Sequence, residues 1–313
     1  MERLVILGSG PAGCAAAIYA ARAGMAPIIL AGLQPGGLLT QTNHVENYPG
    51  FPDGTTGFDL TDAMARQAQR FGAILKYNAA TKIRFALRDN HITLDDGSEL
   101  VAEAVVLALG SRHRLGLPDE KRFLGKGLSY CATCDGAFFR NQSVVVIGGG
   151  DMALEEALAL TAFAAEVHLI HRRATLPATK ILADRVLANP KITVHWQNLP
   201  IALEADENGR ISGVRIQSTV TSETTPIPCK GVFVAAGVLP NTELLEDTGL
   251  PLDEQGYIKL VDGSRSLTAL PGVFAAGDCA DPQYRQAIVA AGMGARAGMD
   301  AVNFLSQKQL PST

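Results

Sequence analysis

The sequence predicts an α/β protein made of two three-layer units, the second inserted into the first. A glycine-rich turn between a short apolar strand and a helix occurs twice, and the two turns begin about 140 residues apart. Each unit then closes with an apolar strand that ends in glycine, and a third strand of this kind lies beyond the second unit. A late strand without a unit of its own must return to the first unit.

The first turn follows an apolar strand at residues 4–7, and an alanine-rich helix from Cys14 to about Ala23 and a strand at 27–30 come after it. In such a turn the first glycine permits the tight bend, the second lets backbone N–H groups approach a pyrophosphate, and the third small residue lets the helix pack on the sheet. A plain strand–helix connection is the alternative. We therefore expect a Rossmann-like dinucleotide site whose residues are Gly8, Gly10, Pro11, Ala12 and Gly13.

The second turn follows the strand predicted at 144–147 and leads into a helix that runs through Glu155 to Leu160, then a strand at 167–170. The same argument predicts a second dinucleotide site here. Its candidate residues are Gly148, Gly150, Asp151, Met152 and Ala153.

The domain boundaries follow from the three closing strands, at 105–110, 232–237 and 272–277. We expect a discontinuous first domain of residues 1–112 plus 243–313 and a second domain of residues 113–242. The two crossings, 112–117 and 237–242, are short and are expected to form a hinge.

Composition narrows the function classes. The chain has 313 residues, 47% hydrophobic and 19% charged residues and a net charge of −4. This composition describes an ordinary globular protein, and its total charge gives no argument for a nucleic-acid partner. We expect no membrane span and a cytoplasmic location, because there is no leader segment and Arg22 interrupts the best apolar run. Five cysteines are too few for a disulfide scaffold.

The most reactive pattern is Cys131-Ala-Thr-Cys134, followed by Asp135. Two cysteines three positions apart at a helix start can close a reversible disulfide, and the helix N-terminus stabilises a thiolate. The following carboxylate could move the proton that thiol–disulfide exchange requires. Half of a zinc site is the alternative, but zinc needs four ligands and the other cysteines and histidines are not paired at ligand spacing; we expect no metal.

Six segments carry a family pattern in order: the first glycine turn, residues 36–40 with 45–50, the segment 131–136, the second glycine turn, residues 171–173, and residues 277–278 with 284–287. Together they resemble the low-molecular-weight thioredoxin reductases, a family of FAD-containing pyridine nucleotide-disulfide oxidoreductases. The resemblance covers essentially the whole chain. It implies two Rossmann-like domains, with FAD in the first and NADPH in the second, and a homodimer.

The resemblance also implies residue roles. Cys134 is expected nearer the flavin, Cys131 is expected to attack the substrate disulfide, and Asp135 is expected to be the acid/base. Asp278 is expected to bind the ribityl or phosphate portion of FAD. The other residues expected at FAD, beyond the first glycine turn, are Gly36, Gly37, Leu38, Leu39, Asn47, Gly277, Arg285, Gln286 and Ala287.

The second site departs from the family pattern. His171, Arg172 and Arg173 are present, but Pro177 stands where the family has another arginine, and Met152 replaces a small hydroxylic residue. Losing one guanidinium contact to a 2′-phosphate costs about 1.5–3 kcal/mol, or roughly ten- to a hundredfold in affinity. The electron donor therefore stays open between NADPH, reduced ferredoxin, and another dinucleotide such as a second FAD in this site.

These observations predict an FAD-dependent thiol–disulfide oxidoreductase that reduces thioredoxin or a similar small protein. Two alternatives remain open at this point: a flavin-dependent dithiol oxidase, and a redox-sensing flavoprotein without turnover. Peroxide production would indicate the first, and failure to turn over with any donor would indicate the second.

Overall fold

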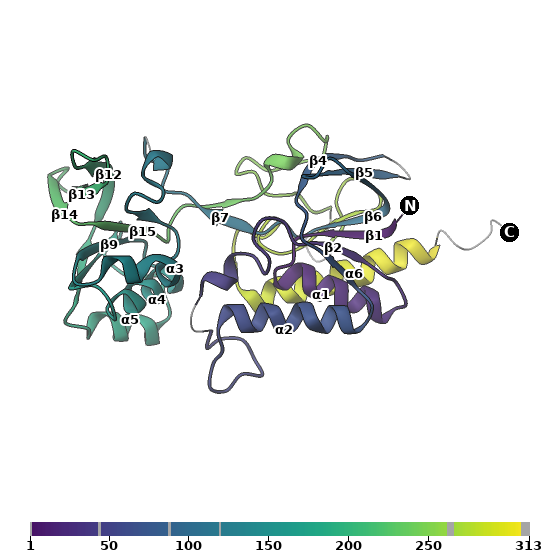
Figure 1. Ribbon diagram of the computed structural model, residues 1–313, viewed down its shortest axis with the longest axis horizontal. Coiled ribbons are helices and arrows are strands. Elements are labelled where there is room, and N and C mark those ends of the chain that lie inside the picture. The colour runs from purple at the N-terminus through teal and green to yellow at the C-terminus, as the bar shows by residue number, and fades with distance from the viewer. Residues whose placement is uncertain (1, 43–44, 87–88, 119, 262–265, 308–313) are drawn as a thin grey trace. The chain divides into compact units, whose positions relative to one another are not determined.

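The computed structural model describes residues 2–42, 45–86, 89–118, 120–261 and 266–307. The chain forms two compact units (Figure 1). The first comprises residues 1–40, 44–112 and 239–313, and the second comprises residues 41–43 and 113–238.

The first unit is built on a seven-stranded sheet in which β6 (Glu99–Leu107) is central. The sheet order is β3 (Ile74–Lys76), β2 (Ile28–Leu30), β1 (Glu2–Leu7), β6, β5 (Asn90–Leu94) and β4 (Ala80–Arg84). The first half of β6 pairs with β5, whereas its last residues pair in parallel with β17 (Val273–Ala275). The late strand thus returns to the first sheet, as the sequence predicts.

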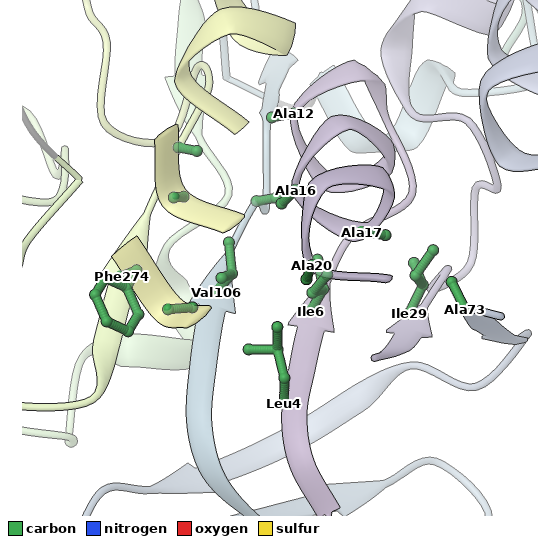
Figure 2. Close-up of a cluster of buried hydrophobic side chains, with 14 of the residues drawn as sticks. Leu4, Ile6, Ala12, Ala16, Ala17, Ala20, Ile29, Ala73, Val106 and Phe274 are labelled. Carbon is green, nitrogen blue, oxygen red and sulfur yellow. The ribbon is translucent and has the colours of Figure 1, made fainter. Parts of the chain in front are cut away.

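The described part of the first unit has three long helices: α1 (Pro11–Arg22), α2 (Gly57–Arg70) and α6 (Ala287–Gln307). The helix α1 begins three residues earlier than expected, because Pro11 occupies its first turn, where a missing N–H costs no hydrogen bond. Figure 2 shows Ala16 and Ala20 of α1 against Ile6 of β1, in the largest apolar cluster of this unit.

Close approach of α1 and α6 depends on two glycines of α6. A Cβ at Gly294 would overlap the backbone of Ala12, and a Cβ at Gly298 would overlap that of Ala16. The two helices therefore pack backbone against backbone, and α1 can use alanine where a larger side chain would hold them apart.

The second unit has a five-stranded parallel sheet and a separate antiparallel sheet. The parallel order is β11 (Ile192–Trp196), β10 (Glu166–His171), β9 (Ser143–Ile147), β15 (Gly231–Val234) and β8 (Leu128–Ser129). The antiparallel sheet consists of β12 (Asn198–Ala205), β13 (Ile211–Ser218) and β14 (Thr224–Pro228). The sequence did not predict these last three strands, and β14 carries two prolines that obscure its pattern.

The two faces of the parallel sheet carry different layers. Val144, Val146, Val167 and Leu169 pack with the helices α4 (Asp151–Leu160) and α5 (Lys180–Leu187). On the other face, Val145, Ile147 and Ile170 pack with β13 and β14. This is a helix–sheet–sheet arrangement of three layers.

Two short paired strands, β7 (Ser111–His113) and β16 (Val238–Pro240), carry the chain between the units. The remaining described elements are the short helix α3 (Ala132–Asp135) and four helical turns: η1 (Leu38–Gln41), η2 (Glu120–Phe123), η3 (Gly136–Phe139) and η4 (Glu243–Leu245). The second boundary falls at 238/239 rather than at 242/243, because Asn241 donates a hydrogen bond to the Leu109 carbonyl at 3.0 Å and accepts one from Arg112 at 2.9 Å.

Candidate active site

The first glycine turn forms a cradle without room for side chains. Gly8 has φ +110°, a conformation that favours glycine, and a Cβ there would overlap the Ala108 carbonyl. A Cβ at Gly13 would overlap the carbonyl of Gly8. Gly10 caps α1 without a side-chain hydrogen bond, so the first backbone N–H groups of α1 are open to an anion.

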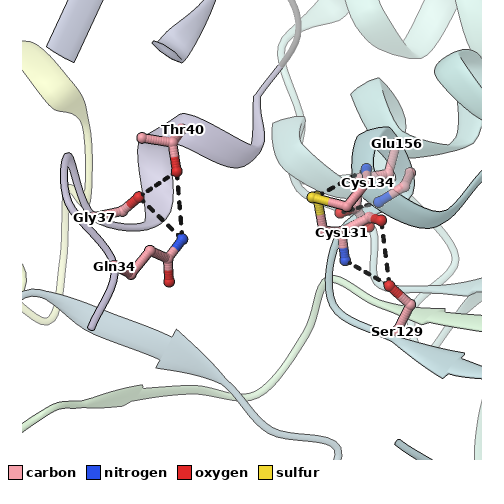
Figure 3. The surroundings of a disulfide bond; sticks show 8 residues. Gln34, Gly37, Thr40, Ser129, Cys131, Cys134 and Glu156 are labelled. Carbon is pink, nitrogen blue, oxygen red and sulfur yellow. Dashed lines mark hydrogen bonds between the residues drawn. A yellow bond between two sulfur atoms is a disulfide. The ribbon is translucent and has the colours of Figure 1, made fainter. Parts of the chain in front are cut away.

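The segment after β2 comes back to this turn. The N–H of Gly36 donates to the Ser9 hydroxyl at 2.9 Å, and a Cβ at Gly36 would collide with Thr61. Gln34 Nε2 and the Thr40 hydroxyl both donate to the Gly37 carbonyl, at 3.2 and 2.9 Å, as Figure 3 shows. These bonds fix the turn that leads into Leu38 and Leu39 of η1.

The C-terminal segment brings the remaining expected residues to the first unit. Asp278 follows Gly277 (φ +78°), and its Oδ2 accepts a hydrogen bond from the Ser111 hydroxyl at 2.9 Å. Burial raises the pKa of the Asp278 carboxyl, and the Ser111 hydrogen bond opposes that shift. Asn47 donates to Gln286 at 3.1 Å, so two predicted residues far apart in the sequence meet.

Arg285 and Gln286 lie just before α6, which begins at Ala287. Both side chains are exposed, and Arg285 is a non-glycine residue with positive φ (+49°). A backbone in this strained conformation turns the chain sharply into α6.

The two cysteines of the second unit are bonded to each other. Cys131 and Cys134 form a disulfide with a Cα–Cα separation of 5.4 Å. Cys131 is the N-cap of the short helix α3 (Ala132–Asp135), and its sulfur accepts a hydrogen bond from the Cys134 N–H at 3.1 Å. Cys131 is buried and Cys134 is exposed. The Ser129 hydroxyl also binds the Cys131 backbone, accepting from its N–H and donating to its carbonyl.

Asp135 ends α3 and is half-buried. Its N–H donates to the Cys131 carbonyl at 3.2 Å, which holds it one helical turn after Cys131 and directly after Cys134. Another carboxyl, which the sequence analysis did not single out, lies beside the same turn: Oε1 of Glu156 accepts from the Ala132 N–H at 3.4 Å (Figure 3).

Glu156 is buried in α4, and burial raises its pKa to about 7, with further help from the negative charge of Glu155. The sequence held a signal for it. Glu156 lies on the helical face of Ala153, Ala157 and Leu160, which is otherwise apolar and buried.

The second glycine turn is held from within by His171. A Cβ at Gly149 would overlap the imidazole ring. The two ring nitrogens face the carbonyls of Gly148 and Thr175 at 3.0 and 2.9 Å. His171 is buried, so it ties the turn to the following loop and does not present a free ring to a phosphate.

The other predicted residues of this site differ in exposure. Asp151 Oδ1 accepts from the Thr179 N–H at 2.6 Å, which anchors the loop that carries Pro177. Met152 lies against His113, with 3.0 Å between its sulfur and the ring Nε2. Arg172 and Arg173 are exposed. Two guanidinium groups are therefore available to an anionic group at this edge of the sheet.

Comparison with known proteins shows the family of the chain. The pyridine nucleotide-disulphide oxidoreductase family matches residues 2–294. A thioredoxin reductase of Mycolicibacterium smegmatis is 47% identical over 306 residues, which cover 97% of this chain and 97% of that protein. The chain belongs to the thioredoxin reductase family.

Two further proteins are similar over nearly the whole chain. The bifunctional thioredoxin reductase/thioredoxin of Mycobacterium leprae is 44% identical over 98% of this chain and 66% of that protein. The crystal structure of Lactococcus lactis thioredoxin reductase matches with a TM-score of 0.92 at 38% identity, covering 98% of this chain and all of that one.

The chain is thus a thioredoxin reductase-type flavoprotein disulfide reductase, and FAD is its cofactor. The first unit fits that cofactor. The cradle at Gly8 and Gly13 has no room for a Cβ, and the N-terminus of α1 lacks a side-chain cap. The Asp278 carboxyl is half-buried and can accept hydrogen bonds from a ribityl chain.

The three remaining cysteines are not expected to take part in thiol–disulfide exchange. Cys14, Cys229 and Cys279 are buried, and burial raises their pKa values to about 12, 12 and 11. Thiols protonated at neutral pH are poor nucleophiles. No described helix is both long and apolar enough to cross a membrane.

Proposed function

We propose that this thioredoxin reductase-type enzyme reduces a disulfide of thioredoxin or of a similar small protein. The observation that carries the proposal is the Cys131–Cys134 disulfide, which has one exposed cysteine and belongs to a chain of this family. The similar protein of Mycobacterium leprae carries thioredoxin in its own name, which supports thioredoxin as the partner.

The chain's own residues carry out the exchange. Bound FAD would supply the two electrons that open the Cys131–Cys134 bond. The Cys131 thiolate would then attack one sulfur of the substrate, and the Cys134 thiolate would displace the substrate's second thiol and restore the enzyme disulfide. Asp135 would give the departing sulfur a proton.

Assignment of the attacking sulfur needs a direct test, because Cys131 is the buried member of the oxidised pair. In Cys134→Ser, a Cys131 thiolate should trap the substrate as a stable mixed disulfide, visible by mass spectrometry. In Cys131→Ser, trapping should fall at least tenfold. Trapping only by Cys131→Ser would reverse the assignment of the two cysteines.

For the electron donor, we propose a dinucleotide bound at Gly148, Gly150 and Ala153, with its phosphates near Arg172 and Arg173. Pro177 supplies no charge, so a 2′-phosphate would have two guanidinium partners rather than three. An anaerobic titration of the flavin absorbance with NADPH tests this. Bleaching near one equivalent supports NADPH; a flavin that stays oxidised with NADPH and NADH contradicts it and directs the search to reduced ferredoxin and to a flavin count per chain.

A separate aerobic assay of oxygen uptake distinguishes the alternative functions. A dithiol oxidase would produce peroxide steadily with a dithiol substrate, and a sensor would complete no second turnover with any donor. The homodimer and the cytoplasmic location expected from the sequence stay predictions; light scattering during size-exclusion chromatography measures the first.

A further inference from the structure

A buried carboxyl with an unused oxygen lies beside the redox pair. Glu156 is only 6% exposed, its Oε1 accepts from the Ala132 N–H, and its Oε2 is buried without a hydrogen-bond partner among the described residues. Ala132 directly follows Cys131, so this carboxyl is bonded to the backbone next to the buried cysteine. A lone buried oxygen of this kind normally finds a partner in at least one state of the protein.

The turn that bears the disulfide is pressed against α4, the helix of Glu156. Gly136, which follows α3, leaves so little space that a Cβ there would lie 3.2 Å from the side chains of Leu160 and Phe163. Ala132 is itself 2% exposed. A charge on the carboxyl and a charge on the Cys131 sulfur would therefore share one poorly hydrated region, where like charges repel strongly.

Within the part of the chain that the structure describes, no cation is found beside this carboxyl that would offset the repulsion. Asp135 of α3 and Glu155 of α4 are both acidic, and the ring nitrogens of His171, from β10, are taken by backbone carbonyls. On the sides packed against α4, β9 presents only valines and α5 presents Leu182 and Val186. Burial and the charge of Glu155 already raise the Glu156 pKa to about 7, so its proton exchanges near neutral pH.

We infer that Glu156 is a positioning residue for the redox pair and that, in the reduced protein, Glu156 and Cys131 share a single proton. Reduction of the disulfide takes up two electrons and two protons and leaves two thiols. The Cys131 thiol then loses its proton to the Glu156 carboxylate, so a thiolate and a neutral carboxyl replace a thiol and a carboxylate. No net charge is added to the buried region, and the Ala132 N–H keeps its acceptor.

The test compares the disulfide equilibrium of Glu156→Gln with that of the wild-type holoenzyme. Each protein is equilibrated anaerobically with reduced and oxidised dithiothreitol at pH 6 and at pH 8, quenched with acid and alkylated after denaturation. The fraction of the Cys131–Cys134 peptide in the dithiol form is counted by mass spectrometry. Dithiothreitol exchanges the same two electrons and two protons as the enzyme disulfide, so these protons cancel in the equilibrium constant. Any pH dependence of that constant therefore comes from ionisation of the thiols and of groups linked to them.

At pH 6 Glu156 carries its proton and resembles glutamine, so the two proteins should have the same equilibrium constant. At pH 8 the carboxylate opposes thiolate formation in the wild type alone. The variant should then favour the dithiol by about five- to tenfold, the effect of a thiol pKa about one unit lower. Glu166→Gln removes the same charge from an exposed position on the far face of the sheet and should follow the wild type at both pH values.

Equal constants at both pH values would overturn the inference, and so would a Glu156→Gln shift of equal size at both, which indicates a merely structural role. A second measurement uses the wild-type protein, so it does not depend on whether the variant folds. In wild-type protein at pH 8, the infrared difference between reduced and oxidised states should show the band of a protonated carboxyl appearing on reduction. That band should shift in protein carrying ¹³C-labelled glutamate, and its absence would also overturn the inference.

Discussion

The hydroxyl of Ser111 donates a hydrogen bond to Oδ2 of Asp278 at 2.9 Å, and it joins the start of β7 to the segment after β17. The bond holds a half-buried carboxyl whose pKa is raised by desolvation. The carboxyl keeps further acceptor positions, which suit hydroxyl donors of FAD.

Asp278→Asn should therefore weaken FAD binding by roughly ten- to a hundredfold, because a hydrogen bond from FAD to a charged acceptor contributes about 1.5–3 kcal/mol. Flavin released on dilution, followed by its fluorescence, measures the dissociation constant. Asp281→Asn is the control, since the Oδ1 of Asp281 already accepts hydrogen bonds from the N–H groups of Gln283 and Tyr284. Equal loss of flavin from both variants would contradict a specific role for Asp278.

Pro177→Arg should tighten NADPH binding by about tenfold and leave NADH binding unchanged, because the new guanidinium reaches only a 2′-phosphate. The flavin titration with each nucleotide is the measurement. Pro177→Gln, which removes the proline without adding charge, should behave as the wild type. A matching gain for NADH would place the arginine on some other part of the nucleotide.

Gly294→Ala should lower the free energy of unfolding by about 1–3 kcal/mol, because its methyl group would overlap the backbone of Ala12 and force α1 and α6 apart. Gly292→Ala lies on the same helix with open space around it and should be neutral or slightly stabilising. Thermal melting of both variants tests the prediction. The packing argument fails if the two variants melt at the same temperature.

The raised pKa of Glu156 also makes a stability prediction. Because the folded protein binds this proton more tightly than the unfolded chain does, the stability contributed at low pH is lost as the pH rises from about 4.5 to about 7. Relative to the wild type, oxidised Glu156→Gln should gain on the order of 3 kcal/mol between pH 5 and pH 8. Denaturant unfolding of both proteins at the two pH values is the measurement. If the carboxyl were already ionised at pH 5, the difference in unfolding free energy between variant and wild type would be the same at pH 5 and pH 8.

Several features of this protein could be predicted from short stretches of its sequence. The strand–turn–helix order, the need for glycine at Gly8 and the reactive spacing of Cys131 and Cys134 depend on local backbone sterics and residue periodicity. A few neighbouring residues are enough to predict such features, and the return of the late strand to the first sheet followed from counting strands.

Only the tertiary structure decided which side chains are buried and what they meet. In the sequence Glu156 is an ordinary helix residue, and only the packing of α3 on α4 shows that it is buried. The sequence pattern indicates a phosphate ligand at His171, but in the structure its ring fills the space beside Gly149. Asn47 bonds to Gln286, which lies far along the chain. Burial, pKa and hydrogen-bond partners are set by elements that are distant in sequence. No local pattern contains them, because they arise when the elements pack.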